Sequence, residues 1–165
     1  MSDSLTIKCH SLSETKTLAG CFALLLRAGL VVGLQGPLGV GKSAFARYVI
    51  QRSCGEAQEV PSPTFTLVQS YETQAGLPVM HMDLYRLEAP EEAFELGVED
   101  SFYEAANLVE WPSKMGGFWP ADAASIEISF ADEDARLFEI AGDESLIGPL
   151  RELAQKAGLA LVRPA

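Results

Sequence analysis

The chain lacks a long apolar run and has few cysteines. These absences argue against a membrane-spanning protein and against a small domain held together by disulfides or a metal. No stretch approaches the roughly 18 apolar residues of a membrane-spanning helix. The N-terminus lacks the basic start and apolar core of a signal peptide. Cys9, Cys21 and Cys54 are odd in number and far apart, so they form neither a metal-ligand spacing nor a disulfide framework. These features predict a cytoplasmic protein that does not contact a membrane. The length of 165 residues predicts one domain over residues 1–165.

Basic residues are also scarce. The 12 Lys and Arg residues face 23 Asp and Glu residues, which gives a net charge of −11. Residues 1–60 hold six basic and four acidic residues, net +2, whereas residues 61–165 hold six basic and 19 acidic residues, net −13. Because Lys and Arg supply the affinity for phosphate backbones, the chain is not expected to bind DNA, or to bind RNA except through another protein. The acidity also favours solubility, and by itself it does not indicate a docking surface.

One short segment carries a specific chemical pattern. Residues 36–43 read Gly-Pro-Leu-Gly-Val-Gly-Lys-Ser, which fits the phosphate-binding pattern G-x-x-x-x-G-K-[S/T]. Gly36 and Gly41 let the backbone turn so that its N–H groups approach phosphate oxygens. Lys42 supplies positive charge at the β- and γ-phosphates, and the Ser43 hydroxyl is suited to ligate Mg²⁺. The segment predicts a P-loop.

The sequence on either side of this loop supports that interpretation. Residues 30–34 are mostly apolar, as in a buried parallel strand, and residues 43–53 have apolar side chains at helical spacing. A strand followed by a glycine loop and a helix is the context in which the pattern binds phosphate. The helix start adds free N–H groups and the positive end of a dipole.

The remaining periodicity predicts an α/β fold, which we expect to be a P-loop NTPase-like domain with a central sheet flanked by helices. Helices are expected over residues 13–27, 91–96, 102–106 and 149–156, and strands over 67–71, 77–83, 107–110, 125–130 and 137–141. Ser13 is the expected N-cap of the first helix and Gly29 its end, and Pro149 is expected at the first position of the last helix. Antiparallel pairing within 67–83 and 125–141 would make the sheet mixed.

Two acidic residues stand at the ends of apolar strands. Asp83 follows residues 79–82, and Glu110 follows residues 107–109. Ligands of open α/β sheets lie beyond the carboxyl ends of the strands, where an acid can hold a Mg²⁺-bound water or orient a nucleophile. A solvated carboxylate with no catalytic role is the alternative for each residue taken singly.

A loop rich in hydroxyl groups forms the third feature. Residues 62–68 read Ser-Pro-Thr-Phe-Thr-Leu-Val, and Pro61 and Pro63 restrict the backbone there. A Thr hydroxyl near the γ-phosphate is one way in which a switch loop senses the nucleotide state. A Ser/Thr turn that leads into a strand is the alternative.

Taken together, these segments resemble the bacterial TsaE (YjeE) family of small P-loop ATPases. The resemblance rests on residues 36–43, on 62–68, on His-Met-Asp-Leu-Tyr-Arg-Leu at 81–87 and on Val-Glu-Trp-Pro at 109–112, and it extends over about residues 12–141. The stretch at 81–87 is far more specific than the P-loop. The chain departs from the family at Pro37, Val40, Ser43 and Ala44, but Ser43 keeps a hydroxyl that can ligate Mg²⁺.

The resemblance implies a role for particular residues. Ser43 and Glu110 would ligate Mg²⁺, Asp83 would place the attacking water, and Lys42 would hold phosphate. Among their neighbours, His81 would pack or orient other residues, Tyr85 and Arg86 would contact a partner or support the switch, and Arg136 would match a family arginine or form a surface ion pair. The full set expected to contact the nucleotide is Glu14, Gly36, Leu38, Gly39, Val40, Gly41, Lys42, Ser43, Thr64, Thr66 and Trp111.

The resemblance also implies a biological role. The family takes part in threonylcarbamoyladenosine modification of tRNA, so the chain is expected to bind ATP with Mg²⁺ and to hydrolyse it slowly by itself. Its expected partners are the threonylcarbamoyl transferase subunit TsaD and the paralogous companion TsaB, which would carry the tRNA. ATP turnover would then reset the complex between catalytic cycles.

Three other functions remain open from the residues alone. A small-molecule kinase needs arginines over the phosphates, but beyond residue 60 the only arginines are Arg86, Arg136, Arg151 and Arg163, which do not cluster. A GTPase would need an Asn-Lys-x-Asp motif, and Asn107 is the only asparagine in the sequence. A nucleotide sensor that does not hydrolyse its ligand would share every feature described so far.

Overall fold

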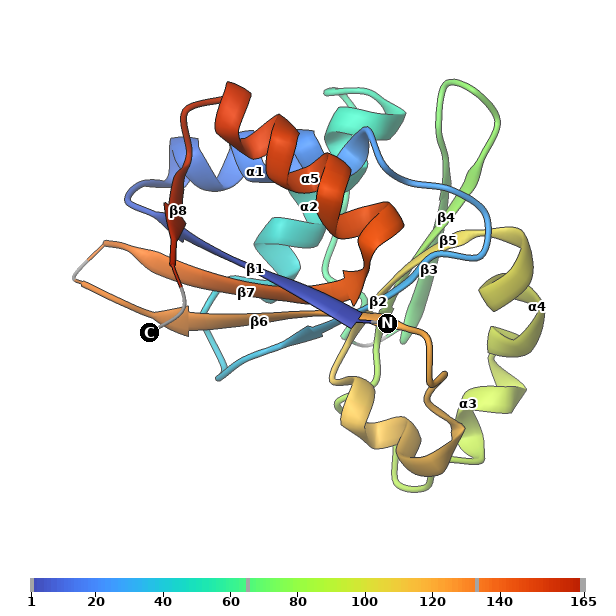
Figure 1. Ribbon diagram of the computed structural model, residues 1–165. Helices are drawn as coiled ribbons and strands as arrows, with labels where there is room; N and C mark the ends of the chain where they lie inside the picture. The colour runs from blue at the N-terminus through green and yellow to red at the C-terminus, as the bar shows by residue number, and fades with distance from the viewer. Residues whose placement is uncertain (1, 65, 133, 164–165) are drawn as a thin grey trace.

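The computed structural model describes residues 2–64, 66–132 and 134–163 and contains one eight-stranded sheet (Figure 1). Its strands, in chain order, are β1 (Ser2–Cys9), β2 (Val31–Gln35), β3 (Val68–Glu72), β4 (Pro78–Asp83), β5 (Ala106–Glu110), β6 (Ala124–Phe130), β7 (Arg136–Asp143) and β8 (Ala160–Val162). The helices are α1 (Leu12–Ala23), α2 (Lys42–Cys54), α3 (Glu92–Glu95), α4 (Val98–Glu104) and α5 (Glu144–Lys156), with a 3₁₀ segment η1 (Pro112–Phe118).

The sheet is mixed, as the sequence predicts. Its strand order is β3-β4-β5-β2-β6-β7-β1-β8. The four central strands β4, β5, β2 and β6 are parallel to one another. The strands on either side of them are antiparallel, since β3 pairs antiparallel with β4, and β7 pairs antiparallel with β6. The parallel strands therefore present their carboxyl ends along one edge of the sheet, which is where α/β folds place ligands.

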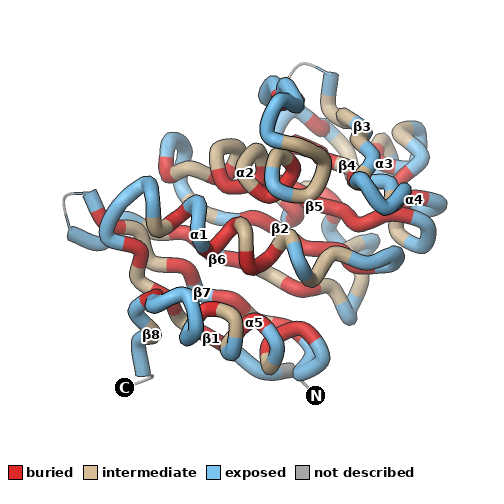
Figure 2. The backbone as a smooth tube through the Cα atoms, turned by 90° about the horizontal axis from the view of Figure 1, so that it is seen from above, coloured by how far each residue is buried: buried red, intermediate tan, exposed pale blue. Residues whose placement is uncertain are grey.

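Helices cover both faces of the sheet (Figure 1). The larger core cluster joins α1, α2 and α5 to one face through side chains such as Phe22, Phe45 and Leu150, all of which are completely buried. The smaller cluster joins α3 and α4 to the other face through Ala93 and Val98. Figure 2 shows the buried residues concentrated along the central strands. Among the described residues, no helix has the length and hydrophobicity needed to cross a membrane.

The structure corrects the predicted ends of two helices. Helix α1 is capped by Ser11, whose hydroxyl accepts from the Glu14 amide, and not by Ser13, and it ends at Ala23 well before Gly29. Helix α5 begins at Glu144, capped by Asp143, so Pro149 lies inside it and not at its start. Because Pro149 and Ser145 are exposed, water can satisfy the Ser145 carbonyl that the missing proline N–H leaves free.

Other elements differ in extent or were not predicted. Strands β1 and β8 were absent from the prediction, although Leu5, Ile7 and Cys9 alternate as buried side chains along β1. Helix α4 starts four residues before the expected helical turn at 102, and residues 112–118, for which no helix was predicted, form η1. Strand β1 pairs with both β7 and β8 and so extends the sheet beyond the β6–β7 hairpin.

Candidate functional site

The three sequence features meet at the carboxyl edge of the parallel strands. Asp83 and Glu110 end β4 and β5 and are direct partners in the parallel register. Glu110 also lies opposite Leu34 of β2, the strand that leads into the P-loop. The strand order thus brings together residues that are far apart in the sequence.

The backbone of the P-loop requires glycine at two positions. Gly36 has φ +145°, and a Cβ there would lie 2.4 Å from the Ile128 carbonyl oxygen, so a side chain would clash with the backbone of β6. Gly41 caps α2 with φ +114°, a conformation that other residues rarely adopt. The loop therefore delivers the free amides of the α2 start to the edge of the sheet.

Lys42 lies inside the loop and is only 5% exposed. Its ammonium donates to the carbonyl oxygens of Gly36 at 2.6 Å and Pro37 at 3.0 Å. It also lies 4.4 Å from the centre of the Trp111 ring, a cation–π distance. Burial lowers the pKa of Lys42, while the nearby charges of Glu110 and Asp83 act in the opposite direction. A phosphate group at this position would supply a stronger partner for the ammonium than two neutral carbonyls.

Glu110 joins the P-loop to β4. Its carboxylate is 2% exposed, and the Ser43 hydroxyl lies 2.9 Å from both carboxylate oxygens. On the other side, His81 Nε2 lies 2.7 Å from Glu110 Oε2. The contact with His81 was not assigned from the sequence, where the only signal was the position of His81 two residues before Asp83 on an apolar strand.

Asp83 is held by a different set of groups. Its Oδ2 accepts from the Thr64 hydroxyl at 3.1 Å, and its Oδ1 accepts from the Tyr85 amide at 3.0 Å. The Ser62 and Thr64 hydroxyls lie 2.8 Å apart. Two of the three hydroxyls predicted from the sequence are therefore linked to Asp83, while Phe65 of the same motif lies outside the described residues.

Other predicted contact residues lie differently. The Thr66 hydroxyl accepts from Gln69 and not from any described site residue. Glu14 accepts from the His10 amide at 2.7 Å, at the start of α1. Leu38 is 68% exposed at the loop tip, whereas the Val40 side chain is buried in the core and its amide donates to the Pro37 carbonyl at 3.3 Å.

Trp111 and Arg136 support the site in ways that the sequence did not reveal. Trp111 has φ +59°, an uncommon conformation for a residue other than glycine, and its ring packs 5.0 Å from that of Tyr85. Arg136 donates from Nε to the Val40 carbonyl at 3.1 Å, so it braces the P-loop from β7. Both arrangements depend on contacts between distant segments.

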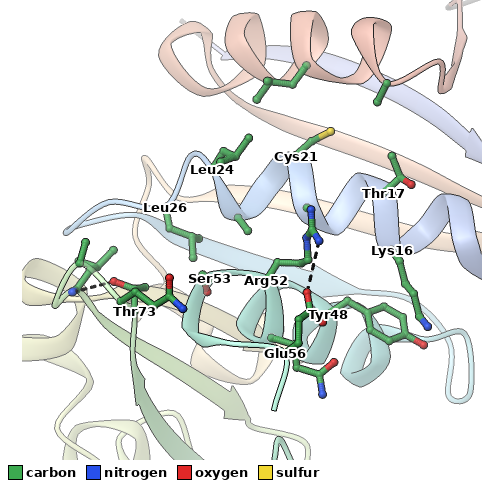
Figure 3. A pocket seen from close by; sticks show the side chains of 18 of the residues that line it. Lys16, Thr17, Cys21, Leu24, Leu26, Tyr48, Arg52, Ser53, Glu56 and Thr73 are labelled. Atoms are coloured by element: carbon green, nitrogen blue, oxygen red, sulfur yellow. Dashed lines mark hydrogen bonds and ion pairs between the residues drawn. The ribbon is translucent and has the colours of Figure 1, made fainter. Parts of the chain in front are cut away.

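Figure 3 shows a hollow that is lined by residues other than those of this site. It has a volume of about 1050 Å³ and is bordered by α1, α2, α5 and the turn between β3 and β4. Lys16, Arg52 and Lys156 line it, and Arg52 of α2 pairs with Glu56, which lies two residues beyond the end of that helix. None of the predicted nucleotide or catalytic residues lines this hollow, so we place the functional site at the P-loop, where the buried polar groups converge.

The donor set beside the P-loop fits Mg²⁺ in the presence of a phosphate ligand. Ser43 and Glu110 offer hard oxygen donors, which Mg²⁺ prefers. No cluster of three or more His, Cys, Asp or Glu side chains within the described ranges is arranged to cage a metal. Mg²⁺ bound with a nucleotide needs only one or two protein ligands, because phosphate oxygens and water complete its shell.

Comparison with known proteins gives consistent matches. The family model described as "Threonylcarbamoyl adenosine biosynthesis protein TsaE" matches residues 9–138. A Rickettsia bellii protein named tRNA threonylcarbamoyladenosine biosynthesis protein TsaE is 39% identical over 134 residues, which cover 81% of this chain and 92% of the relative. The Bacillus subtilis protein of the same name is 36% identical over 74% of this chain and 76% of its own length. The crystal structure of Bacillus subtilis YdiB superposes with a TM-score of 0.74 at 26% identity and covers 95% of this chain and 98% of that one.

Proposed function

Because this chain belongs to the TsaE family, we propose that it is the ATP-binding and ATP-hydrolysing component of the machinery that makes threonylcarbamoyladenosine in tRNA. The names of the relatives support the pathway, and the similarity to YdiB supports a P-loop NTPase-like fold. The single observation that carries the chemistry is the contact between Ser43 of the P-loop and Glu110 at the end of β5. It joins a phosphate-binding loop to a buried carboxylate at the sheet edge.

Each residue of the site has a proposed task. Lys42 and the amides of residues 39–43 hold the phosphates, and Ser43 and Glu110 hold Mg²⁺ directly or through water. Mg²⁺, when bound, neutralises charge on the phosphate oxygens. Asp83 orients the attacking water, because its carboxylate is an acceptor fixed beside the loop by Thr64 and the Tyr85 amide.

The nucleotide would be flanked by further residues. Trp111 is proposed to lie beside the phosphates, and Glu14 is proposed to lie near the base. Arg136 of β7 donates to the Val40 carbonyl of the P-loop. In the pairing of β1 with β7, Arg136 lies opposite Cys9. The next residue, His10, donates its amide to Glu14 at the start of α1. This chain of contacts supports a position of the α1 start near the loop. Thr64 and Thr66 are proposed to sense the nucleotide state, with Thr64 making the direct link to Asp83.

We further propose that the chain works as one cytoplasmic domain over residues 1–165 and acts through TsaD and TsaB, which hold the tRNA. The net charge of −11 agrees with indirect handling of tRNA, since a phosphate backbone would be repelled by the chain. ATP turnover would reset the complex between cycles of modification.

The proposal is tested by measuring ATP hydrolysis by this chain alone, with TsaD and TsaB, and with tRNA added. We expect slow turnover alone and stimulation by the two partners. Lys42→Ala should lose ATP binding, and Lys16→Ala, which changes a lysine that lines the separate hollow, is the matched control. Normal ATP binding by Lys42→Ala would contradict the P-loop assignment.

The same experiment separates the alternative functions. ATP binding without hydrolysis, even with both partners present, would indicate a nucleotide sensor. Phosphate transfer to a small hydroxylated metabolite, with no stimulation by the partners, would indicate a kinase.

A further inference from the structure

His81 has a position that packing alone does not explain. It lies on β4 with 1% of its surface exposed, and its Nε2 contacts the Glu110 carboxylate at 2.7 Å. Glu110 in turn contacts the Ser43 hydroxyl. A continuous chain of polar groups, buried at His81 and Glu110 and half-buried at Ser43, therefore runs from β4 through β5 to the start of α2. Burying polar groups costs free energy unless each has a hydrogen-bond partner, so these three side chains are restricted to orientations that keep their contacts.

The second ring nitrogen of His81 indicates where its proton lies. Nδ1 is buried, and no described residue offers it a hydrogen-bond partner. A proton on Nδ1 would be a buried donor without an acceptor, which is rarer and more costly than an unpaired acceptor. The proton is therefore assigned to Nε2, which then donates to Glu110, since an ionised carboxylate can only accept.

We propose, on the basis of the function proposed above, that His81 is a positioning residue for the cation bound with the nucleoside triphosphate. Its Nε2–H fixes Glu110 Oε2 and so keeps the carboxylate turned toward Ser43. Without this donor, Glu110 is free to rotate away from Ser43, and the two oxygen donors for the cation are no longer held together. Groups that orient metal ligands in this way typically change metal affinity by about 10- to 100-fold when removed.

Three variants test this role. His81→Leu removes both ring nitrogens but keeps an apolar side chain of moderate size. His81→Gln retains a terminal N–H donor that can reach Glu110. Met82→Leu is the matched control, because Met82 is the next residue on β4, is equally buried and packs in the smaller core cluster.

Two measurements are made on each variant, one of binding and one of activity. The first is ATP affinity in excess EDTA, and the second is the Mg²⁺ concentration that gives half-maximal ATP hydrolysis. We expect His81→Leu to raise the Mg²⁺ midpoint by about 10-fold or more while it changes the EDTA affinity by less than about 2-fold. His81→Gln should return to within about 3-fold of the wild-type midpoint, and Met82→Leu should match the wild type.

A third readout uses the chain without nucleotide or metal. Imidazole ¹⁵N spectra should show His81 as the Nε2-protonated tautomer, and Glu110→Gln should shift that signal. This measurement needs no histidine variant, so it decides the contact even if His81→Leu does not fold.

The outcomes separate this role from the proposed function. A wild-type Mg²⁺ midpoint for His81→Leu, no recovery in His81→Gln, or an Nδ1-protonated ring would overturn the role of His81 and leave the ATPase proposal standing. Failure of the wild-type chain to bind ATP under any condition would overturn both.

Discussion

The ends of β4 and β5 lie side by side in the sheet, yet they hold their carboxylates in different ways. Glu110 is 2% exposed and is held between Ser43 of α2 and His81 of β4, both parts of regular elements. Asp83 is 5% exposed and is held by Thr64 of the loop before β3 and by the amide of Tyr85, just past the strand. The Glu110 carboxylate is therefore held by a helix and a strand, whereas the Asp83 carboxylate is held partly by a loop.

This difference suggests that the two carboxylates have different tasks. A carboxylate fixed by helix and sheet suits a constant task such as holding a cation. A carboxylate held by a loop responds when that loop moves, and loops have a lower local stability than the strands that they join. We therefore expect changes in nucleotide state to reach Asp83 through Thr64 more readily than they reach Glu110.

The strongest test of the comparison is Asp83→Asn. The amide keeps the shape of the side chain and an oxygen that can accept from Tyr85, but it removes the charge that is proposed to orient water. Turnover stimulated by the partners should fall on the order of 10³-fold in single-turnover assays, because positioned acids and bases contribute about 10²- to 10⁴-fold. ATP affinity should change by less than about 3-fold. Turnover equal to the wild type would show that Asp83 is not catalytic.

The corresponding change at the other strand end is Glu110→Gln. It should raise the Mg²⁺ midpoint by about 10- to 100-fold, since the change removes the charge of a proposed Mg²⁺ ligand, while ATP affinity in EDTA stays near the wild-type value. Glu139→Gln is the matched control, because Glu139 is exposed on β7. If Glu110→Gln and Asp83→Asn gave the same kinetic profile, the proposed division between the two ends would be wrong.

The loop itself is tested by a pair of threonines. Thr64→Val removes the hydroxyl that donates to Asp83 and should lower turnover by about 10-fold, the effect of one hydrogen bond to a charged group. Thr66→Val removes a hydroxyl that contacts only Gln69 among the described residues, and it should lower turnover by less than about 2-fold. Both rates are measured at saturating Mg²⁺-ATP. Equal losses would indicate that the loop rearranges when nucleotide binds.

The smallest expected effect concerns stability and comes from Cys9, which lies away from both strand ends. It sets the pH range in which these assays are made. Burial raises the pKa of Cys9 from 9.0 to about 11. A raised thiol pKa gives stability that is complete below pH 9 and is lost as the pH rises toward 11, because the unfolded chain releases its proton first. The free energy of unfolding should fall by about 1 kcal/mol between pH 8 and pH 10 from this group. Urea unfolding of Cys9→Ala should show a correspondingly weaker pH dependence than the wild type.

Local patterns predicted most of the elements, and their failures have physical causes. The apolar residues 24–26 continue the helical spacing of α1, but Leu24 is 73% exposed, and Leu25 and Leu26 pack on the core from outside the helix. Pro149 was expected at a helix start, yet the Asp143 side chain caps the helix six residues earlier. At α1 tertiary packing outweighs a local preference, whereas at α5 the local cap at Asp143 outweighs the preference of proline for a helix start.

The candidate site divides in the same way. The glycines of the P-loop, Lys42 and Ser43, and the acids at two strand ends could all be identified from the sequence, because each depends on local backbone geometry or on an apolar run. The contacts of His81 with Glu110 and of Arg136 with Val40 could not, since they join residues 29 and 96 positions apart. Nothing in the local pattern distinguishes His81 from a histidine that only packs.

The sequence by itself determined the phosphate-binding loop, the alternation of strands and helices, and the family to which the chain is similar, because these depend on short-range spacing and side-chain type. Only the tertiary structure decided that β4, β5 and β2 are neighbours with their carboxyl ends together. Strand order follows from how the helices bury their apolar faces against the sheet, a property of the whole chain. That order places Ser43 against Glu110 and Glu110 against His81, and it makes a site from three separate segments.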